Sequence, residues 1–512
     1  MILALALRLP HLAQRPMHTD EAVHAIKFGQ VLEEHTYQYN PFEYHGPTLI
    51  FATLIPAYLQ GQYTLVEVTE QTLRLVPALF GAGLILILFA ATGFIEKRTL
   101  LFIALFTAMS PAFVFYSRYY IMEILLAFFT FTAIIAAFQY VRTRKFLWAL
   151  LAGISLGLMH ATKETCILAW FAMASALFLT YYSDKKHVKE KLQKLQWHTI
   201  IAAALAGIFV SMLFMSTFLQ NPRGIVDSVL TYKTYIDRGV GGFDSHVHPW
   251  NQYFKWLLVN NYEGRPLWTE ALIFLLAIPG FFAIFSKRYN HHSNRFFLKF
   301  IAFYTLVLTV TYALIPYKTP WSLLGFYHGL IFIAGVGAVA LFDWARFRLP
   351  KILLAILLSG GIVHLGWQAV QLNFEYDADY SNPYVYAHTH KNIYELVEAI
   401  DSITFYSPHG KDTFIEVVCP GDDYWPLPWY LREYTQVGYF SEFDFTKPAA
   451  PLIVTMPELE SQLLKKLYEI PPPGQRDMYI PHFPSGLWLR HGVEIELFVR
   501  KDMWDEWHRQ SP

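Results

Sequence analysis

Residues 100–141 read LLFIALFTAMSPAFVFYSRYYIMEILLAFFTFTAIIAAFQYV. The stretch contains two apolar runs, 100–115 and 120–141, on either side of the more polar step YSRY at 116–119. A helix needs about 20 apolar residues to cross the hydrocarbon core of a bilayer, and both runs come close to that length. The stretch therefore predicts two consecutive membrane spans joined by a very short connection.

The composition of the whole chain also indicates a membrane protein. Of its 512 residues, 54% are hydrophobic and 16% are charged, and the mean hydropathy is +0.29. This is too much apolar surface for one water-soluble core, so we expect membrane lipids around the chain. The formal net charge is zero, which gives no support to a nucleic-acid partner.

Apolar runs of span length recur along most of the chain. They lie at 72–95, 100–115, 120–141, 146–160, 167–182, 199–219, 268–285, 296–315, 321–342 and 352–372. The apolar stub at 1–9 is too short to span and lacks a signal-peptide pattern, as if the chain began inside its first span. Together these segments predict about eleven spans. The run at 47–59 is short and contains Pro56, so we expect it to lie at the interface or to re-enter.

Lysine and arginine mark every second connection between these spans. Short cytoplasmic loops are enriched in these residues, so the basic loops are predicted to lie inside. They are found at 97–98, 142–145, 185–191, 287–295 and 346–351. The loops predicted to lie outside are 11–46, 116–119, 161–165, 220–267, 316–320 and everything after 372. We expect a multi-pass protein of the plasma (inner) membrane whose functional loops are extracytoplasmic.

The chain changes character after residue 372. Runs at 413–418, 451–456 and 493–499 have the pattern of strands, and 392–403 and 457–468 have helical periodicity. The soluble segment has about 140 residues, an ordinary size for one domain. The predicted fold is thus an α-helical polytopic membrane domain at 1–372, with long outer loops at 11–46 and 220–267. A small extracytoplasmic α/β domain follows at 373–512.

The first outer loop contains an acidic helix start, HTDEAVH at 18–24. Thr19 can cap this helix, and Asp20 and His24 then share one face. The ordinary explanation is that acids in a first turn complement the helix dipole. At the outer mouth of a membrane bundle, such a carboxylate can instead act as a general base or as a metal ligand. Asp20 and Glu21 are therefore candidate catalytic residues, and His24 is a candidate lining residue of a substrate cavity.

The second outer connection places Glu123 about one turn into a span. An ionised side chain there costs on the order of 2 to 3 kcal/mol, so it needs a partner or a water-filled cavity. Arg118 can supply the partner. Alternatively, Arg118 can hold a lipid phosphate while Glu123 faces a catalytic cleft, with Tyr119 lining the cavity. The sequence leaves both arrangements open.

Two lysines break the rule that basic residues lie inside. Lys163, followed by Glu164, and Lys318 stand at predicted outer ends of helices. Lysine side chains that extend towards the interface are the ordinary explanation. Their recurrence on one side of the membrane also favours a cationic site for an anionic lipid headgroup, with Trp321 next to it.

The long outer loop contains the sequence HVHPW at 246–250. His246 and His248 can both bind a metal ion if the backbone is extended, and Trp250 can line a cavity. The side chains that could complete a metal site are Asp20, Glu43 and His45. No compact set of ligands with a recognised spacing accompanies the pair, so a divalent metal is one hypothesis and a metal-free cavity is the other.

The order of these parts resembles the GT-C glycosyltransferases of the protein O-mannosyltransferase and aminoarabinose-transferase type. The resemblance rests on the acidic pair after the first span, the His-Gly-Pro at 45–47, the Ser-Arg at 117–118, the Thr-Lys at 162–163 and the Lys-Thr-Pro-Trp at 318–321. The HTDEA start, the HVHPW loop and the tail motif DYWPLPWYLR at 423–432 look like the "flippase activity-associated" subfamily. Relatives often carry Asp where this chain has Glu123.

The resemblance implies a cavity open to the outer leaflet and a polyprenyl-phosphate sugar as donor. It implies that Asp20 is the catalytic base, with Glu21 beside it, and that Arg118, Lys163 and Lys318 lie near the donor phosphate. The acceptor is then a lipid, a glycan or a protein, and no soluble cofactor is required.

A non-catalytic flippase, or a protein associated with one, is the rival interpretation. A flippase must open to both leaflets, and we expect ionisable residues deep in several spans and internal symmetry. The candidate acids and bases instead cluster at the predicted outer ends of spans. The aromatic residues of the tail motif, Trp425, Trp429 and Tyr430, are expected to pack or to anchor at the interface rather than to bind sugar.

Overall fold

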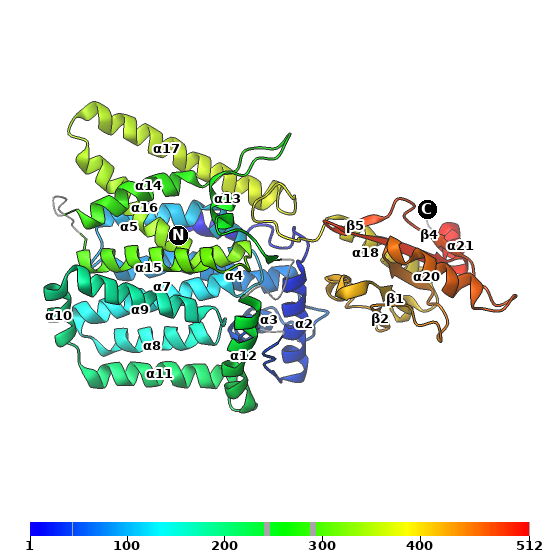
Figure 1. Cartoon of the computed structure of the whole chain (residues 1–512). Coiled ribbons are helices and arrows are strands. Elements are labelled where there is room, and N and C mark those ends of the chain that lie inside the picture. The colour runs from blue at the N-terminus through cyan, green and yellow to red at the C-terminus, as the bar shows by residue number, and fades with distance from the viewer. Residues whose placement is uncertain (43–44, 240–245, 287–292, 511–512) are drawn as a thin grey trace.

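A computed structural model describes residues 1–42, 45–239, 246–286 and 293–510 of the protein. Long helices lie side by side in a bundle, and a small sheet domain stands at one end of it (Figure 1). The bundle consists of α1 (Ile2–Arg8), α4 (Glu70–Leu86), α5 (Lys97–Met109), α6 (Pro111–Ser117), α7 (Glu123–Thr143), α8 (Phe146–His160), α9 (Cys166–Ser183), α11 (Trp197–Met215), α14 (Ala271–Phe285), α15 (Arg295–Leu314), α16 (Leu324–Trp344) and α17 (Arg348–Val370).

The bundle is that of a multi-pass membrane protein. Seven helices of the described chain are long and apolar enough to cross a bilayer, and the bent pair of α5 and α6 makes an eighth if it is one span. Each of the predicted apolar runs coincides with a bundle helix or with this pair. The helices α8 and α14 are apolar but have only 15 residues each. The predicted α-helical polytopic fold is therefore confirmed.

The first of the two runs quoted at the start is broken rather than straight. α5 ends at Met109, and α6 starts at Pro111 and is bent by 58° from α5. Proline has no N–H to donate and is suited to the first turn of a helix, and the Ser110 hydroxyl accepts a hydrogen bond from the Phe113 N–H. The span predicted over 100–115 is therefore a bent pair of helices rather than one straight helix.

The helices α14 and α16 pack backbone against backbone. A Cβ atom on Gly280 would lie 2.0 Å from the carbonyl oxygen of Ile333, and one on Gly337 would lie 1.8 Å from that of Leu276. Small residues allow this close approach, which is a main source of helix association in a bilayer. This contact holds α16, which directly follows η3 (Pro320–Leu323), against α14.

Shorter helices lie at the end of the bundle that faces the sheet domain (Figure 1). They are α2 (Thr19–Glu34), α3 (Thr48–Leu59), α12 (Arg223–Gly239) and α13 (Gln252–Leu258). α2 and α12 run across the direction of the bundle (Figure 1). The lysine-rich α10 (Lys185–Gln193) lies at the opposite end, where Arg144 donates a hydrogen bond to the Lys191 carbonyl at 3.0 Å.

The C-terminal region forms one sheet with helices packed against it. Its strands run in the order β2-β1-β3-β6-β4, with β5 also paired to β6. β2, β1 and β3 are parallel, and β6 is antiparallel to its neighbours. The strands are β1 (Ile415–Val418), β2 (Val437–Phe440), β3 (Leu452–Thr455), β4 (Tyr479–Pro481), β5 (Leu487–Arg490) and β6 (Val493–Arg500), and the α-helices are α18 (Asn392–Phe405), α19 (Leu427–Tyr430), α20 (Glu460–Leu464) and α21 (Lys501–Gln510). β1, β3 and β6 were predicted, whereas β2, β4 and β5 carry too weak a pattern.

Candidate functional site

The acidic helix start lies at the end of the bundle, next to the sheet domain. The residue that caps α2 is His18 rather than Thr19: its ring Nδ1 accepts a hydrogen bond from the Asp20 N–H at 3.0 Å. Glu21 completes the cap because its Oε2 accepts from the His18 N–H at 3.1 Å. The predicted cap at Thr19 is therefore off by one residue.

The carboxylate of Glu21 is buried and fully engaged. The Arg74 guanidinium donates to both oxygens, at 2.7 Å each, and the Tyr120 N–H donates to Oε1 at 2.8 Å. Arg15 approaches the same carboxylate at 3.8 Å. Burial alone would raise the pKa of Glu21, but the charges of Arg74 and Arg15 lower it. Glu21 therefore fixes the start of α2 on the bundle, and the catalytic role expected for it stays a prediction.

Asp20, next to it, points a different way. Its side chain is 43% exposed, and the described chain offers it no ion pair with lysine or arginine. The ring of His18 lies 4.0 Å from its Oδ1. Burial lowers the pKa of His246, and the negative charge of Asp20 opposes that shift. A half-exposed carboxylate without a cation is available to accept a proton.

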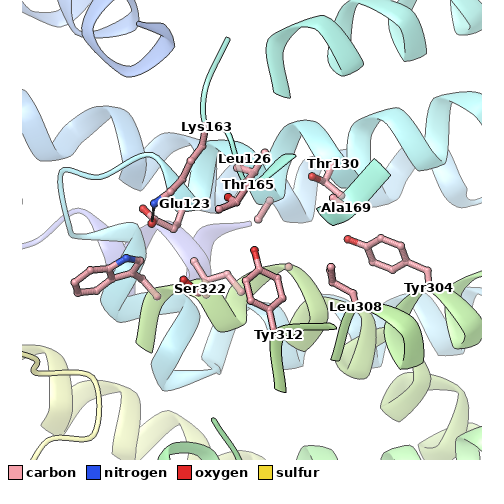
Figure 2. A pocket seen from close by; sticks show the side chains of 14 residues that line it. Glu123, Leu126, Thr130, Lys163, Thr165, Ala169, Tyr304, Leu308, Tyr312 and Ser322 are labelled. Atoms are coloured by element: carbon pink, nitrogen blue, oxygen red, sulfur yellow. Dashed lines mark hydrogen bonds and ion pairs between the residues drawn. The ribbon is translucent and has the colours of Figure 1, made fainter. Parts of the chain in front are cut away.

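A second acidic residue stands at the first position of α7. The carboxylate of Glu123 pairs with the ammonium of Lys163, which precedes α9, and both side chains are buried (Figure 2). Of the two arrangements left open by the sequence, pairing of Glu123 with Arg118 is thus wrong. The pair lines a small cavity of about 30 Å³, enough for one water molecule, together with Thr165 and Tyr312.

Two histidines, His24 and His45, lie next to each other at this end of the bundle. His24 lies one turn after Asp20 on α2, and its pKa is lowered to about 4 by burial and then by the His45 charge, with a smaller effect of Lys163. The His24 and His45 rings are 6.1 Å apart. His24, one turn after Asp20, and His45 are thus neighbours at this end of the bundle.

Glu164 is held in place beside this group. His45 Nδ1 lies 2.8 Å from its Oε2, and the Tyr39 hydroxyl donates to its Oε1 at 2.6 Å. Burial would raise the pKa of Glu164, but the His45 charge and these hydrogen bonds lower it to about 2. Glu164 is therefore ionised and orients His45.

The structure does not direct Arg118 towards a phosphate. Its guanidinium donates to the carbonyl oxygens of Arg8, Pro10 and His11, at 3.1, 2.5 and 3.0 Å, and it stacks on the Phe374 ring. These contacts use its donors to fix the N-terminal segment. The predicted contact between Arg118 and a donor phosphate is not supported by this geometry.

Lys318 is also engaged within the protein. It is buried, and its ammonium donates to the Ile315 carbonyl. Lys163 is therefore the predicted phosphate ligand whose ammonium lies beside a cavity. Its present partner is a carboxylate that an incoming anion would have to displace.

The two histidines of the HVHPW sequence meet a tyrosine from the C-terminal segment. His246 Nδ1 and His248 Nε2 lie 2.7 and 3.2 Å from the Tyr386 hydroxyl. Tyr119 and Trp321 lie against the same group, with ring centroids 5.9 Å apart, whereas Trp250 is 66% exposed at its rim.

The metal hypothesis receives no support from this arrangement. Within the described residues, no three His, Cys, Asp or Glu side chains are grouped as a metal ion requires. Both His246 and His248 hydrogen-bond to Tyr386 instead. Glu43, proposed as a further ligand, lies outside the described residues.

The sequence did not single out two residues that organise this site. Arg74 carried a usable signal, because a charged residue in the apolar run at 72–95 needs a buried partner. Tyr386 carried none, since it lies in a stretch with no periodic pattern between the bundle and the sheet. Its contacts join segments that are about 140 residues apart.

An apolar groove lies on the other face of α9. It has a volume of about 900 Å³ and is lined by α8, α9, α11 and α12, including Ile167, Trp170 and Ile208. The cavity of Glu123 and Lys163 borders the same first turns of α9 through Thr165 and Ala169. A polar cavity and a large apolar groove therefore flank one helix start.

Comparison with known proteins agrees with this architecture. The family model described as dolichyl-phosphate-mannose-protein mannosyltransferase matches residues 2–220. The matched part includes Asp20, Glu123 and Lys163. Among curated proteins, no sequence matches the chain.

Solved structures share the fold over almost the whole chain. ArnT from Cupriavidus metallidurans, bound to undecaprenyl phosphate, has 14% sequence identity and a TM-score of 0.61, with 97% of this chain and 96% of that chain covered. The apo form of ArnT gives 12% identity and a TM-score of 0.63, with 97% and 96% covered. The Archaeoglobus fulgidus oligosaccharyltransferase, in complex with Zn and sulfate, gives 13% identity and a TM-score of 0.56, with 96% and 72% covered. The expected fold is confirmed, since this chain shares the fold of ArnT over almost its whole length.

Proposed function

We propose that this protein is a membrane glycosyltransferase that moves a sugar from a polyprenyl-phosphate donor to an acceptor hydroxyl. The family matched by residues 2–220 is named for transfer of mannose from dolichyl phosphate, and the similar ArnT structure contains undecaprenyl phosphate. Both are polyprenyl phosphates. The apolar groove beside α9 offers space for a prenyl chain next to the cavity of Glu123 and Lys163.

The carboxylate of Asp20 is the observation on which the proposal rests. It is half-exposed and has no lysine or arginine partner in the described chain, unlike the carboxylates of Glu21 and Glu123. A general base must be free to take a proton, and a carboxylate in a tight ion pair is a poor one. Asp20 is therefore the candidate base.

The proposed reaction is an inverting transfer. Asp20 takes the proton of the acceptor hydroxyl as its oxygen forms a bond to the anomeric carbon. The bond between that carbon and the phosphate oxygen breaks, and the electron pair leaves with the polyprenyl phosphate. Lys163 opposes the negative charge that grows on this phosphate once Glu123 has been displaced from it. The steps need no nucleotide and no soluble cofactor.

We further propose that the Asp20 end of the bundle faces outward from the plasma (inner) membrane. The lysine-rich α10 lies at the other end, and basic connections favour the cytoplasmic side. The sheet domain then lies outside as well. The acceptor is a lipid, glycan or protein hydroxyl that reaches the site from that side.

The test is a transfer assay with purified protein and polyprenyl-phosphate hexoses and pentoses, in which release of free polyprenyl phosphate is measured. Asp20→Asn keeps the shape of the side chain and should abolish release while the unfolding temperature stays within a few degrees of wild type. Glu263→Gln changes an exposed acid in the connection between α13 and α14 and should leave release unchanged. Wild-type release by Asp20→Asn would remove Asp20 from the reaction, and a donor that is moved across vesicles without release would indicate a flippase.

A further inference from the structure

Two hydroxyls from the C-terminal part of the chain hold the backbone of Met17, three residues before Asp20. The Met17 N–H donates to the Tyr430 hydroxyl at 2.8 Å, and the Thr389 hydroxyl donates to the Met17 carbonyl at 2.6 Å. Met17 and Thr389 are both buried. Both polar groups of this peptide backbone are therefore satisfied by residues more than 350 positions away in sequence.

The next residue is held from the same side. The His18 ring lies with Nε2 at 3.0 Å from the Tyr386 carbonyl, and its Nδ1 accepts from the Asp20 N–H. A carbonyl can only accept, so Nε2 carries the proton and Nδ1 is left with its lone pair. Tyr386 therefore selects the tautomer of His18 that caps α2.

The tail motif at 423–432 explains how these contacts are brought into place. It contains α19, which rests on the bundle: the Trp429 indole N–H donates to Glu70 Oε1 at 2.8 Å. Arg432 stacks on the Trp429 ring and donates to the carbonyl oxygens of Leu65 and Val68, at 3.3 and 3.1 Å. The motif thus fixes the sheet domain on the loop between α3 and α4, and Tyr430 is carried to Met17.

The segment before α2 is also held by Arg74, a residue of the bundle helix α4. Arg74 donates to the carbonyl oxygens of Arg15 and Pro16, at 2.8 and 3.1 Å, as well as to Glu21. Residues 15–21 are therefore hydrogen-bonded both to the bundle, through Arg74, and to the C-terminal part of the chain, through Thr389 and Tyr430. Asp20 is the acidic side chain of this segment that has no lysine or arginine partner in the described structure, whereas Glu21 pairs with Arg74.

We infer that Thr389 and Tyr430 are positioning residues for catalysis: by fixing Met17 they set the place of Asp20 at the start of α2. The inference rests on the proposed function insofar as Asp20 is the base. A displacement of about 1 Å at a catalytic group can cost on the order of a hundredfold in rate. A sheet domain that lies outside the membrane bundle thus contributes to catalysis without contacting the reacting atoms.

Substitutions at Thr389 test one of the two hydroxyls. Thr389→Val removes the hydroxyl at nearly constant shape, and Thr389→Ser keeps it. We expect kcat to fall about tenfold in Thr389→Val, with the donor KM within twofold of wild type, and to return to within about twofold of wild type in Thr389→Ser. A general loss of stability would lower the amount of folded protein. It would not lower the kcat of Thr389→Val while leaving that of Thr389→Ser near the wild-type value.

Substitutions at two tyrosines test the other hydroxyl. Tyr430→Phe leaves the Met17 N–H without its acceptor and should lower kcat about tenfold. Tyr394→Phe is the control, because the Tyr394 hydroxyl donates to the backbone carbonyl of Gln14 at 3.3 Å, whereas the Tyr430 hydroxyl accepts from the Met17 N–H. Its kcat should match wild type.

Hydrogen exchange without substrate provides a readout that does not depend on activity. The peptide containing 16–21 should exchange severalfold faster in Thr389→Val and Tyr430→Phe than in wild type, Thr389→Ser and Tyr394→Phe. Equal exchange in all five proteins would overturn the inference, and so would faster exchange with unchanged kcat. If wild type transfers no sugar, the proposed function fails, and the exchange data still decide whether these hydroxyls fix Met17.

Discussion

The ammonium of Lys163, just before α9, is paired with the carboxylate of Glu123 at the first position of α7. The two residues belong to different predicted outer connections, 40 positions apart. Their pairing keeps two opposite charges together beside a small cavity (Figure 2). The proposed donor brings a negatively charged phosphate, which would compete with Glu123 for Lys163.

Removal of the Lys163 charge is therefore expected to weaken donor binding. Lys163→Met should raise the donor KM at least tenfold, which corresponds to about 1.4 kcal/mol. Lys318→Met is the control, because the Lys318 ammonium already donates to the Ile315 carbonyl, and it should change the donor KM less than threefold. Steady-state kinetics with a polyprenyl-phosphate sugar measure both. Equal effects of the two substitutions would argue against a specific role of Lys163.

The pair of Glu21 and Arg74 is expected to be structural. Arg74→Met leaves a buried carboxylate without its main partner, which typically costs about 3 to 5 kcal/mol. The unfolding temperature of the purified protein in detergent should fall clearly. Arg98→Met removes an arginine whose side chain is 52% exposed and paired with Glu96 and Asp343, so its effect should be about 0 to 1 kcal/mol. A small change in Arg74→Met would contradict this role.

The lowered pKa of Glu164 predicts that its contribution to the free energy of unfolding decreases in acid. Its pKa is about 2 in the folded protein, below the ordinary value of 4.5, so its ionised form stabilises the fold above pH 4.5. This contribution, on the order of 3 kcal/mol, is lost as the pH falls from 4.5 towards 2. The stability difference between wild type and Glu164→Gln, measured by denaturation from pH 7 to pH 3, should therefore shrink with acidification. A difference that grows at low pH has the wrong sign for this explanation.

One added methyl group should destabilise the protein at Gly337, in the contact of α14 with α16, but not at Gly360, which lies outside that contact. Gly337→Ala places a Cβ against the Leu276 carbonyl and should destabilise the protein by about 1 to 3 kcal/mol. Gly360→Ala, in α17, meets nothing within 4 Å and should be neutral or stabilising by about 0.5 to 1 kcal/mol. Thermal unfolding of the two variants side by side is the measurement. Similar behaviour of both would indicate that α14 and α16 can separate at little cost.

The helices could be predicted because each rests on a local property. The run at 120–141 is mostly apolar, and α7 occupies Glu123–Thr143. The break between Met109 and Pro111 is also local, and the proline was the visible signal for it. The apolar pattern alone continues through that position, so it could not reveal the bend.

The partners of the charged residues could not be predicted in the same way. Arg118 and Glu123 are close in sequence, but α6 ends at Ser117 and α7 begins at Glu123, so their side chains leave in different directions. Glu21 finds Arg74, 53 positions away, and Glu123 finds Lys163. Such pairs depend on how helices are arranged in space, which periodicity along one helix does not contain.

The distance along the chain between Met17 and Tyr430 has a consequence for biosynthesis. The ribosome releases Met17 413 residues before Tyr430, so the helices of the bundle are made between the two. Until then the peptide group of Met17 lacks its acceptor, and the start of α2 cannot take its final place. A nascent or truncated chain that lacks Tyr430 is therefore expected to stay catalytically silent.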